Sequence, residues 1–167
     1  NKKAKFSNGK PITNKDIIFS WQILKKHGRP HTRSYYSLVN NVEEINDYTI
    51  RFIFSEKSNF EMPLIIGLMP IFSYDYWNNQ DFTKTTLEPF VSSGPYTISE
   101  IKTGKSITYS KNKNWWRNNS KDSLGRHNFN KIKYDFYRDK NIALQAFLSG
   151  EYDINIETDA VRWATSY

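Results

Sequence analysis

The feature that most limits how this chain can fold is a tight turn followed directly by a capped helix, in residues 6–24, FSNGKPITNKDIIFSWQIL. Asn8-Gly9 suits the positive φ of a tight turn and predicts that a short strand at 3–6 ends there. Thr13 is placed to cap a helix, with Asp16 three residues later as an acidic variant of the capping box. The apolar side chains that share one face of this predicted helix are Ile17, Ile18, Trp21 and Leu24.

The middle of the chain predicts two hairpins separated by a short helix. Residues 40–56, NNVEEINDYTIRFIFSE, read as two strands joined at Asn46-Asp47, because apolar and polar side chains alternate in the second strand. Residues 59–69, NFEMPLIIGLM, predict a short helix with its proline in the first turn. We expect the aromatic segment that follows to be irregular. Residues 94–112 predict the second hairpin, which turns at Lys-Thr-Gly.

The end of the chain predicts a compact βαβ unit. A strand at 130–138 precedes a helix that Asp139 caps and Gly150 stops, and residues 152–156, YDINI, predict a further strand. The crossover between the two strands is expected to be right-handed. Asp159 is placed to cap a last helix that would run to Tyr167.

The composition disfavours some classes of protein, such as nucleic-acid-binding and membrane-spanning proteins. The net charge is +7, but the longest basic runs are the pairs Lys2-Lys3 and Lys25-Lys26, which favours a solvated surface over a nucleic-acid site. Aromatic residues make up 16% of the chain and can supply a core. There is no cysteine, and no apolar run approaches the length of about 20 residues that spans a bilayer.

No motif in the sequence argues for an enzyme or a cofactor. His27 and His31 have a metal-ligand spacing on a helix, but a glycine and a proline lie between them, so we predict no metal site. Glu43 and Glu44 are neighbours on a predicted strand and point to opposite faces, which does not suit an acid–base pair. Neither a glycine-rich phosphate loop nor a nucleophile elbow is present.

The segment 28–39, GRPHTRSYYSLV, is the best candidate for a binding surface. We expect it to be a loop that proline stiffens, with Arg33 as a planar fork for carboxylates and Tyr35 and Tyr36 as rigid contact area. The alternative interpretation is structural: one tyrosine packs inward and the other covers the end of the preceding helix. Residue types alone favour the structural interpretation.

Several segments together resemble one family, the extracytoplasmic solute-binding proteins of the oligopeptide, dipeptide and nickel type that serve ABC importers. Residues 5–24 resemble the family's turn-and-helix segment, with Asn8 for the usual Asp and Asn14 for the usual Ala. The segments SSGPYTISEI, NWW and ALQAFLSGEYDI resemble three further family motifs in the same order. Residues 81–98, 125–153 and 162–167 carry a likeness to the YejA-like branch, associated with oligopeptides and microcin C-like peptides.

The resemblance implies a periplasmic binding protein-like fold of type II, an α/β fold with a mixed sheet and flanking helices. It further implies a fragment of the first of two lobes that lacks the second lobe. We expect residues 1–84 to form a smaller sub-domain of that lobe and residues 85–167 to form part of its main sheet domain. Without neighbouring strands, the fragment is expected to expose sheet edges and to self-associate.

The resemblance also implies site residues. In relatives, the loop after the first helix supplies a tyrosine that faces the bound peptide, so Tyr35 and Tyr36 are both candidates here. Arg33 is a further candidate, as is Glu157 in the turn Glu-Thr-Asp near the lobe edge. The acidic anchor for the peptide N-terminus lies in the second lobe of relatives and has no counterpart in this chain.

The function implied is capture of oligopeptides in the periplasm and delivery to the permease subunits of an ABC transporter in the inner membrane, without catalysis. The first alternative is the same architecture with a metal chelate or another small solute as its ligand. A basic nucleic-acid-binding module is the third, and it would require a charge-driven, salt-sensitive interaction.

Overall fold

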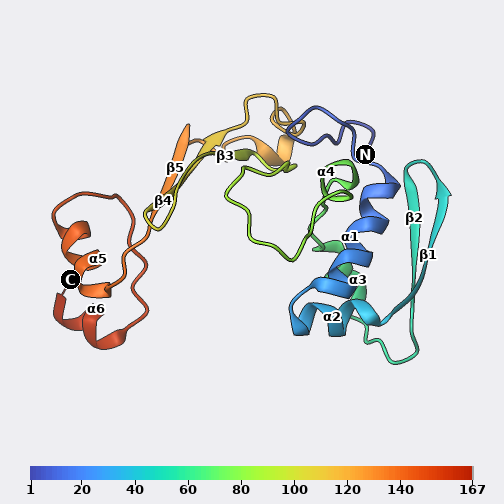
Figure 1. The fold of residues 1–167 in the computed structure, drawn as a ribbon, viewed down its shortest axis with the longest axis horizontal. Helices are drawn as coiled ribbons and strands as arrows, with labels where there is room; N and C mark the ends of the chain where they lie inside the picture. The colour runs from blue at the N-terminus through green and yellow to red at the C-terminus, as the bar shows by residue number, and fades with distance from the viewer. Residues whose placement is uncertain (167) are drawn as a thin grey trace.

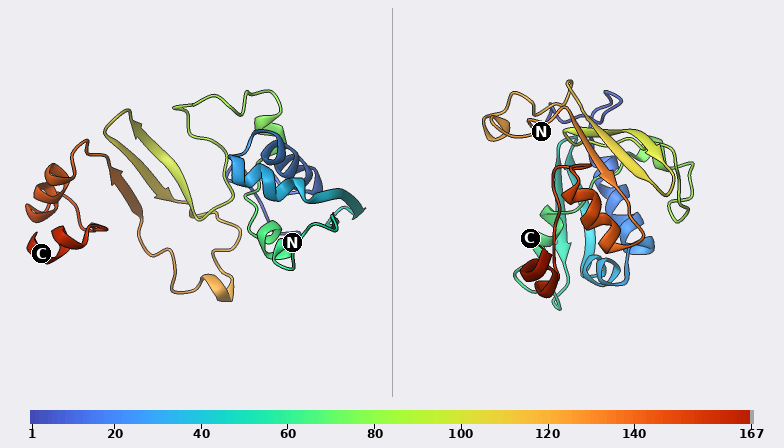
Figure 2. Two further views of the ribbon diagram at one scale, coloured as in Figure 1. Left: turned by 90° about the horizontal axis from the view of Figure 1, so that it is seen from below. Right: turned by 90° about the vertical axis from the view of Figure 1, so that its left-hand side faces the viewer.

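The structure is a computed structural model that describes residues 1–166. Figure 1 shows three groups of elements along the long axis of the molecule, and Figure 2 shows the same order from below. The helices α1–α4 and one hairpin lie at one end, a three-stranded sheet lies in the middle, and two helices lie at the other end. The elements of the first group are α1 (Asn14–His27), α2 (Pro30–Ser37), β1 (Val39–Asn46), β2 (Thr49–Phe54), α3 (Met62–Gly67) and α4 (Tyr74–Trp77). The others are β3 (Tyr96–Lys102), β4 (Ser106–Lys111), the 3-10 turn η1 (Lys121–Ser123), β5 (Lys131–Asp135), α5 (Lys140–Leu148) and α6 (Ala160–Ser166).

The capped helix predicted from the sequence is confirmed as α1. The backbone N–H of Thr13 donates to Oδ2 of Asp16 at 2.8 Å, which is one half of the capping box, and the other half is also present. Gly9 has a φ of 82°, as the turn requires. The expected strand at 3–6 is reduced to a single bridge between Lys5 and Pro11. At the other end of α1, a Cβ on Gly28 would overlap the carbonyl oxygen of Leu24, so glycine is needed there.

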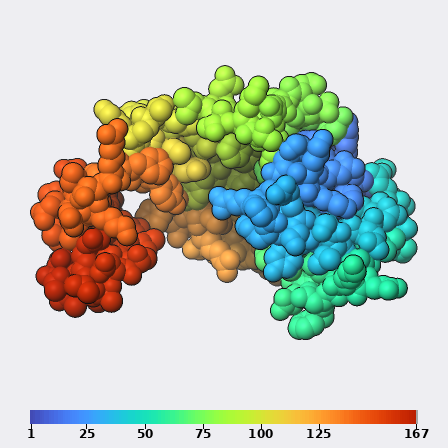
Figure 3. Space-filling view, turned by 60° about the horizontal axis from the view of Figure 1, so that its bottom comes forward, coloured from blue at the N-terminus to red at the C-terminus, as the bar shows by residue number. Residues whose placement is uncertain are grey.

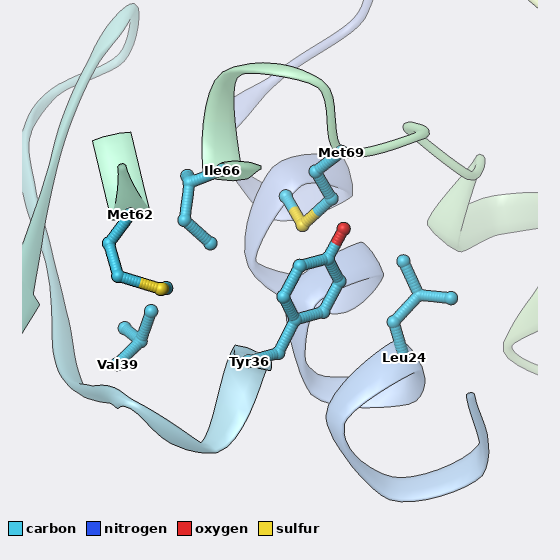
Figure 4. Packing of buried hydrophobic residues seen from close by; sticks show 6 residues of the cluster. All are labelled: Leu24, Tyr36, Val39, Met62, Ile66 and Met69. Atoms are coloured by element: carbon cyan, nitrogen blue, oxygen red, sulfur yellow. The ribbon is translucent and has the colours of Figure 1, made fainter. Parts of the chain in front are cut away.

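The hydrophobic core lies under α1, α2 and α3. Its buried members are Leu24, Tyr36, Val39, Met62, Ile66 and Met69 (Figure 4). Two residues of the predicted apolar face of α1, Ile17 and Trp21, pack against this cluster from partly exposed positions. Every residue that packs in or against the cluster falls between residues 17 and 82.

The remaining buried positions of α1 are polar, and the hydrophobic pattern did not reveal them. The side-chain amide of Asn14 donates to the carbonyl of Asn46 at 2.5 Å, at the turn of the β1–β2 hairpin. Oδ1 of Asp16 accepts the N–H of Tyr74 at 2.9 Å, and Oγ of Ser20 accepts the N–H of Phe72 at 2.7 Å. Three side chains of one helix thereby hold two other segments in place.

Both predicted hairpins are confirmed. Strands β1 and β2 pair antiparallel, and β3 and β4 pair antiparallel with a turn at which Gly104 has a φ of 70°. Strand β5 extends the second sheet, whose order is β3-β4-β5. The short helix α3 has Pro63 in its first turn, as predicted. The aromatic segment expected to be irregular contains the short helix α4.

The predicted βαβ unit is wrong. Asp139 caps α5 by accepting the N–H groups of Asn141 and Ile142, and Gly150 ends it with a φ of 79°, but residues 152–156 form no strand. The hydroxyl of Tyr152 instead donates to the carbonyl of Ala143 at 2.8 Å and folds the segment back onto α5. An alternating pattern predicts a strand only where a partner strand lies beside it, and none does among residues 1–166.

The predicted loop at 28–39 is also wrong, because residues 30–37 form the helix α2. Pro30 occupies the first turn, where its missing N–H has no helical partner to lose and its fixed φ suits the helix. At the end of the chain, Asp159 accepts the N–H of Arg162 at 3.0 Å and caps α6 as predicted. Tyr167, the expected end of this helix, lies outside the described residues.

The role of Ser20 can be tested by replacing it with alanine. The variant Ser20→Ala leaves the N–H of Phe72 without its acceptor at a position where Ser20 is fully buried. An unsatisfied buried donor costs about 1–3 kcal/mol, so the free energy of unfolding from urea titration is expected to fall by that amount. The exposed Ser34→Ala serves as control and is expected to change stability by less than about 0.5 kcal/mol. Equal effects of the two variants would contradict the anchoring role.

Candidate ligand-binding surface

Helix α2 turns the two candidate tyrosines in different directions. Adjacent residues on a helix point about 100° apart, so a core on one side of α2 can take one ring while the other faces solvent. The indole N–H of Trp21 on α1 donates to the carbonyl of Tyr36 at 3.1 Å, which fixes the rotation of α2 about its axis. Tyr36 then faces the core, whereas Tyr35 is 43% exposed.

Tyr36 is part of the hydrophobic core. Only 6% of it is exposed, and its ring lies between α1 and the segment that carries Met69 (Figure 4). Burial disfavours the charged phenolate and raises the pKa of Tyr36 above its ordinary value. This placement agrees with the structural interpretation for one of the two tyrosines.

The exposed side of α2 is a basic surface. It carries Arg33 and Tyr35, with Arg29 and His31 at the start of the helix, and the segment 28–39 contains no acidic residue. Within residues 1–166, Arg33 forms no ion pair. Its guanidinium therefore has donors available for a carboxylate, beside an aromatic ring in solvent. We call Arg33 and Tyr35 the α2 surface.

Glu157 is engaged in the local structure before α6. Its side chain is 7% exposed, forms an ion pair with Arg162 at 3.3 Å, and accepts the N–H groups of Thr158 and Asp159 at 2.9 and 2.8 Å. The N–H of Asp159 and the Arg162 guanidinium lower the pKa of Glu157 below its ordinary value. Glu157 lies in the group at the opposite end of the molecule from α2 (Figure 1), so the structure does not bring it together with the α2 surface.

Two depressions in the surface of the described residues lie away from all four candidates. A shallow depression of about 210 Å³ lies beside the ion pair of Lys10 and Asp75. A second, of about 590 Å³, is lined by Trp116 and Arg117 among others. Figure 3 shows an opening between the C-terminal group and the rest of the molecule. Neither depression is lined by a predicted site residue.

The described part of the chain has no group of three or more histidine and acidic side chains placed to hold a metal ion. None of its helices has both the length and the apolar character needed to cross a membrane.

Residues 1–167 match the family described as bacterial extracellular solute-binding proteins, family 5 Middle. The match covers the whole chain. A putative binding protein of Brucella melitensis is 37% identical over 100% of this chain and 27% of its own length. The probable peptide-binding protein YejA of Agrobacterium fabrum is 35% identical over 98% of the chain and 28% of its own length. The peptidoglycan-binding protein YepA of the same organism is 34% identical over 96% of this chain and 26% of its own length.

Solved structures share the fold at lower identity. The oligopeptide-binding protein AppA of Bacillus subtilis, in complex with a nonapeptide, superposes with a TM-score of 0.75 at 22% identity, over 99% of this chain and 32% of that one. NikZ of Campylobacter jejuni, in complex with Ni(L-His), superposes with a TM-score of 0.74 at 15% identity, over 92% of this chain and 30% of that one. The fold is therefore that of periplasmic binding proteins, as the sequence resemblance implied, and the chain spans about a quarter to a third of the length of these relatives.

The opposite placement of the two tyrosines gives a matched pair of variants. Truncating the buried ring in Tyr36→Ala is expected to lower the free energy of unfolding by about 3–5 kcal/mol, the range for large aromatic-to-alanine changes in a core. Tyr35→Ala is expected to change it by less than about 0.5 kcal/mol, because Tyr35 lies outside the core. Both values follow from urea unfolding monitored by circular dichroism. A large loss in Tyr35→Ala would show that its ring is structural as well.

The carboxylate of Glu157 makes the end of the chain sensitive to acid. Because its folded pKa lies below the ordinary value of 4.5, ionised Glu157 stabilises the turn above that pH, and the stabilisation is lost as pH falls through the folded pKa. Amide exchange at Thr158 and Asp159, corrected for intrinsic rate, is expected to quicken in that window. In Glu157→Gln this pH dependence is expected to weaken, with Asp159, whose pKa is also lowered, retaining its own part. An unchanged profile in the variant would contradict the assignment.

Proposed function

We propose that this chain, which belongs to the bacterial extracellular solute-binding proteins of family 5, is part of a binding protein that captures oligopeptides and delivers them to an ABC importer. The observation that carries the proposal is the match along the whole chain, together with 35% identity to a probable peptide-binding protein. The fold shared with an oligopeptide-binding protein that holds a nonapeptide supports the same ligand class.

The proposed protein acts without catalysis in the periplasm, and its partners are the permease subunits of the transporter in the inner membrane. Family membership supports a location outside the cytoplasm. Binding and release are the whole chemistry of such a protein, so no nucleophile or acid–base pair is required. A pocket that satisfies the peptide backbone and leaves side chains in water would accept many sequences.

We further propose that residues 1–84 form a smaller sub-domain and residues 85–167 form part of the main sheet domain of a first lobe, with a second lobe outside this chain. The coverage of 27% of the Brucella relative supports a longer polypeptide. A peptide would be enclosed when two lobes close about a hinge. The exposed side of α2 would form part of one wall of such a site.

Within this wall, the α2 surface is the proposed ligand contact. Tyr35 offers a rigid ring at the surface, and Arg33 offers a fork for a peptide carboxylate. Tyr36 supports the surface from below by filling the core under α2. Glu157 is a weaker candidate for contacting the ligand, because its carboxylate oxygens already accept three hydrogen bonds.

A peptidoglycan fragment is the second candidate ligand, favoured by the 34% identity to a peptidoglycan-binding protein. A microcin C-like peptide is a narrower form of the first proposal, and it rests on the resemblance of residues 81–98, 125–153 and 162–167 to the YejA-like branch. A nickel chelate finds support only in distant structures such as NikZ.

The proposal is tested by calorimetric titration of the full-length gene product that contains residues 1–167, with a mixture of defined oligopeptides and, separately, with peptidoglycan fragments. Arg33→Ala is expected to weaken peptide affinity by about tenfold or more, because a charge-assisted hydrogen bond is worth about 1.5–3 kcal/mol. Tyr35→Ala is expected to weaken it by about the same factor, and Ser34→Ala, between the two, is the matched control. If both variants bind peptide with unchanged affinity, the α2 surface does not contact the ligand.

The 167-residue chain by itself is expected to bind the same peptides weakly or not at all, because one wall leaves most of a ligand in water. Native mass spectrometry of the purified chain shows this directly. A clean protein mass is the expected result, whereas a mass excess that resolves into short peptides would mean that one lobe suffices.

A further inference from the structure

Two arginines lie one turn apart at the start of helix α2. The backbone N–H of Arg33 donates to the carbonyl of Arg29 at 3.0 Å, so the two residues have the i, i+4 spacing of a helical turn. Residues at this spacing are neighbours on a helix, with about 5–6 Å between their Cβ atoms. Both arginines are exposed. Their guanidinium groups can therefore reach two ligand groups that lie close together.

No acidic side chain balances these two charges. The sequence contains no aspartate or glutamate in residues 17–42. Among residues 1–166, neither Arg29 nor Arg33 forms an ion pair. Three other arginines each pair with a carboxylate, namely Arg51, Arg117 and Arg162. Like charges at i and i+4 repel each other, so the pair on α2 lowers the stability of the folded chain.

The helix dipole gives Arg29 and Arg33 no structural role either. The amino end of a helix carries a partial positive charge, so cations are favourable near the carboxyl end. Lys25 and Lys26 have that placement in the last turn of α1, and Lys25 also donates to the carbonyl of Val39 at 3.3 Å. Arg29 and Arg33 lie instead at the amino end of α2, whose first turn has no acidic residue. An anionic ligand held by both guanidinium groups would relieve their mutual repulsion.

We propose that Arg29 and Arg33 together select peptides whose C-terminal residue is acidic. Such a residue carries two carboxylates a few bonds apart, one at the chain end and one on the side chain. Each carboxylate can accept both hydrogen bonds of one guanidinium fork, which gives a charge-assisted pair of defined geometry. A neutral last residue leaves one fork without a partner. The inference rests on the proposed peptide function, which it narrows to one class of peptide.

The selection is tested by calorimetric titration of the full-length gene product that contains residues 1–167. The ligands are alanine-based peptides of several lengths, each in one version that ends in glutamate and one that ends in glutamine. Because the two versions differ in a single charge, their affinity ratio isolates the second carboxylate. The glutamate version is expected to bind about tenfold or more tightly. This ratio is expected to shrink at high salt, which screens exposed charges.

Variants of the arginines assign the ratio to particular side chains. Arg29→Gln and Arg33→Gln each remove one guanidinium and are each expected to reduce the ratio to about two or less. The melting temperature is expected to stay within about 1 °C in both, because no ion pair or core contact is lost. Arg51→Gln is the matched control, since Arg51 is an exposed arginine on β2 that pairs with Glu43 at 3.4 Å. It is expected to keep the full ratio.

Four results would overturn the proposal, and they separate it from the peptide function. If both peptide versions bind the unaltered protein equally, peptides are captured without selection at the last residue, and only the selection fails. A ratio that persists in Arg29→Gln and Arg33→Gln assigns it to other residues. If Arg51→Gln lowers the ratio as much, the overall charge of the protein is responsible. If no peptide of any length binds, the peptide function fails and the selection fails with it.

Discussion

The buried polar side of α1 is the interaction on which the first half of the structure depends. Asn14, Asp16 and Ser20 point away from solvent, and each bonds a backbone group of a segment at least 32 residues further along the chain. Hydrophobic contacts could hold these segments near α1 in several orientations, since they have no direction. Hydrogen bonds to particular backbone atoms select one orientation, because an unmatched buried donor or acceptor costs free energy.

The position of the candidate binding surface follows from that anchoring. With α1 fixed, the indole of Trp21 bonds the backbone of Tyr36 and sets the rotation of α2. Tyr36 then fills the core, and the same rotation turns its neighbour Tyr35 outward. The packing of Tyr36 in the core therefore also fixes the position of Tyr35 on the surface. An exposed ring on a rigid helix loses little conformational freedom when a ligand binds.

Local signals in the sequence predicted local structure well. The turn at Gly9, the capping box of Thr13 and Asp16, and the caps of α5 and α6 depend on residues within a few positions of one another, and all are present. The sequence failed where the outcome depended on distant neighbours. Pro30 was interpreted as a loop residue although it also suits the first turn of a helix, and only the packing of α2 on α1 decides between the two. The buried polar residues of α1 gave no periodic signal, because their partners lie far away in the chain.

The two halves of the chain differ in what stabilises them. Residues 17–82 contain a closed core in which apolar groups from helices and strands meet. The sheet that follows is held mainly by backbone bonds, with its apolar side chains partly in water, and backbone bonds alone contribute little net stability because water competes for the same groups. A sheet of this size is stable when its apolar face is buried, as that burial supplies the larger share of the folding free energy. The register of β3, β4 and β5 is nevertheless well specified, because shifting it by one residue would move isoleucine and tyrosine to the face that carries serine and lysine. This alternation of apolar and polar side chains is typical of a sheet that forms one layer of a larger packing.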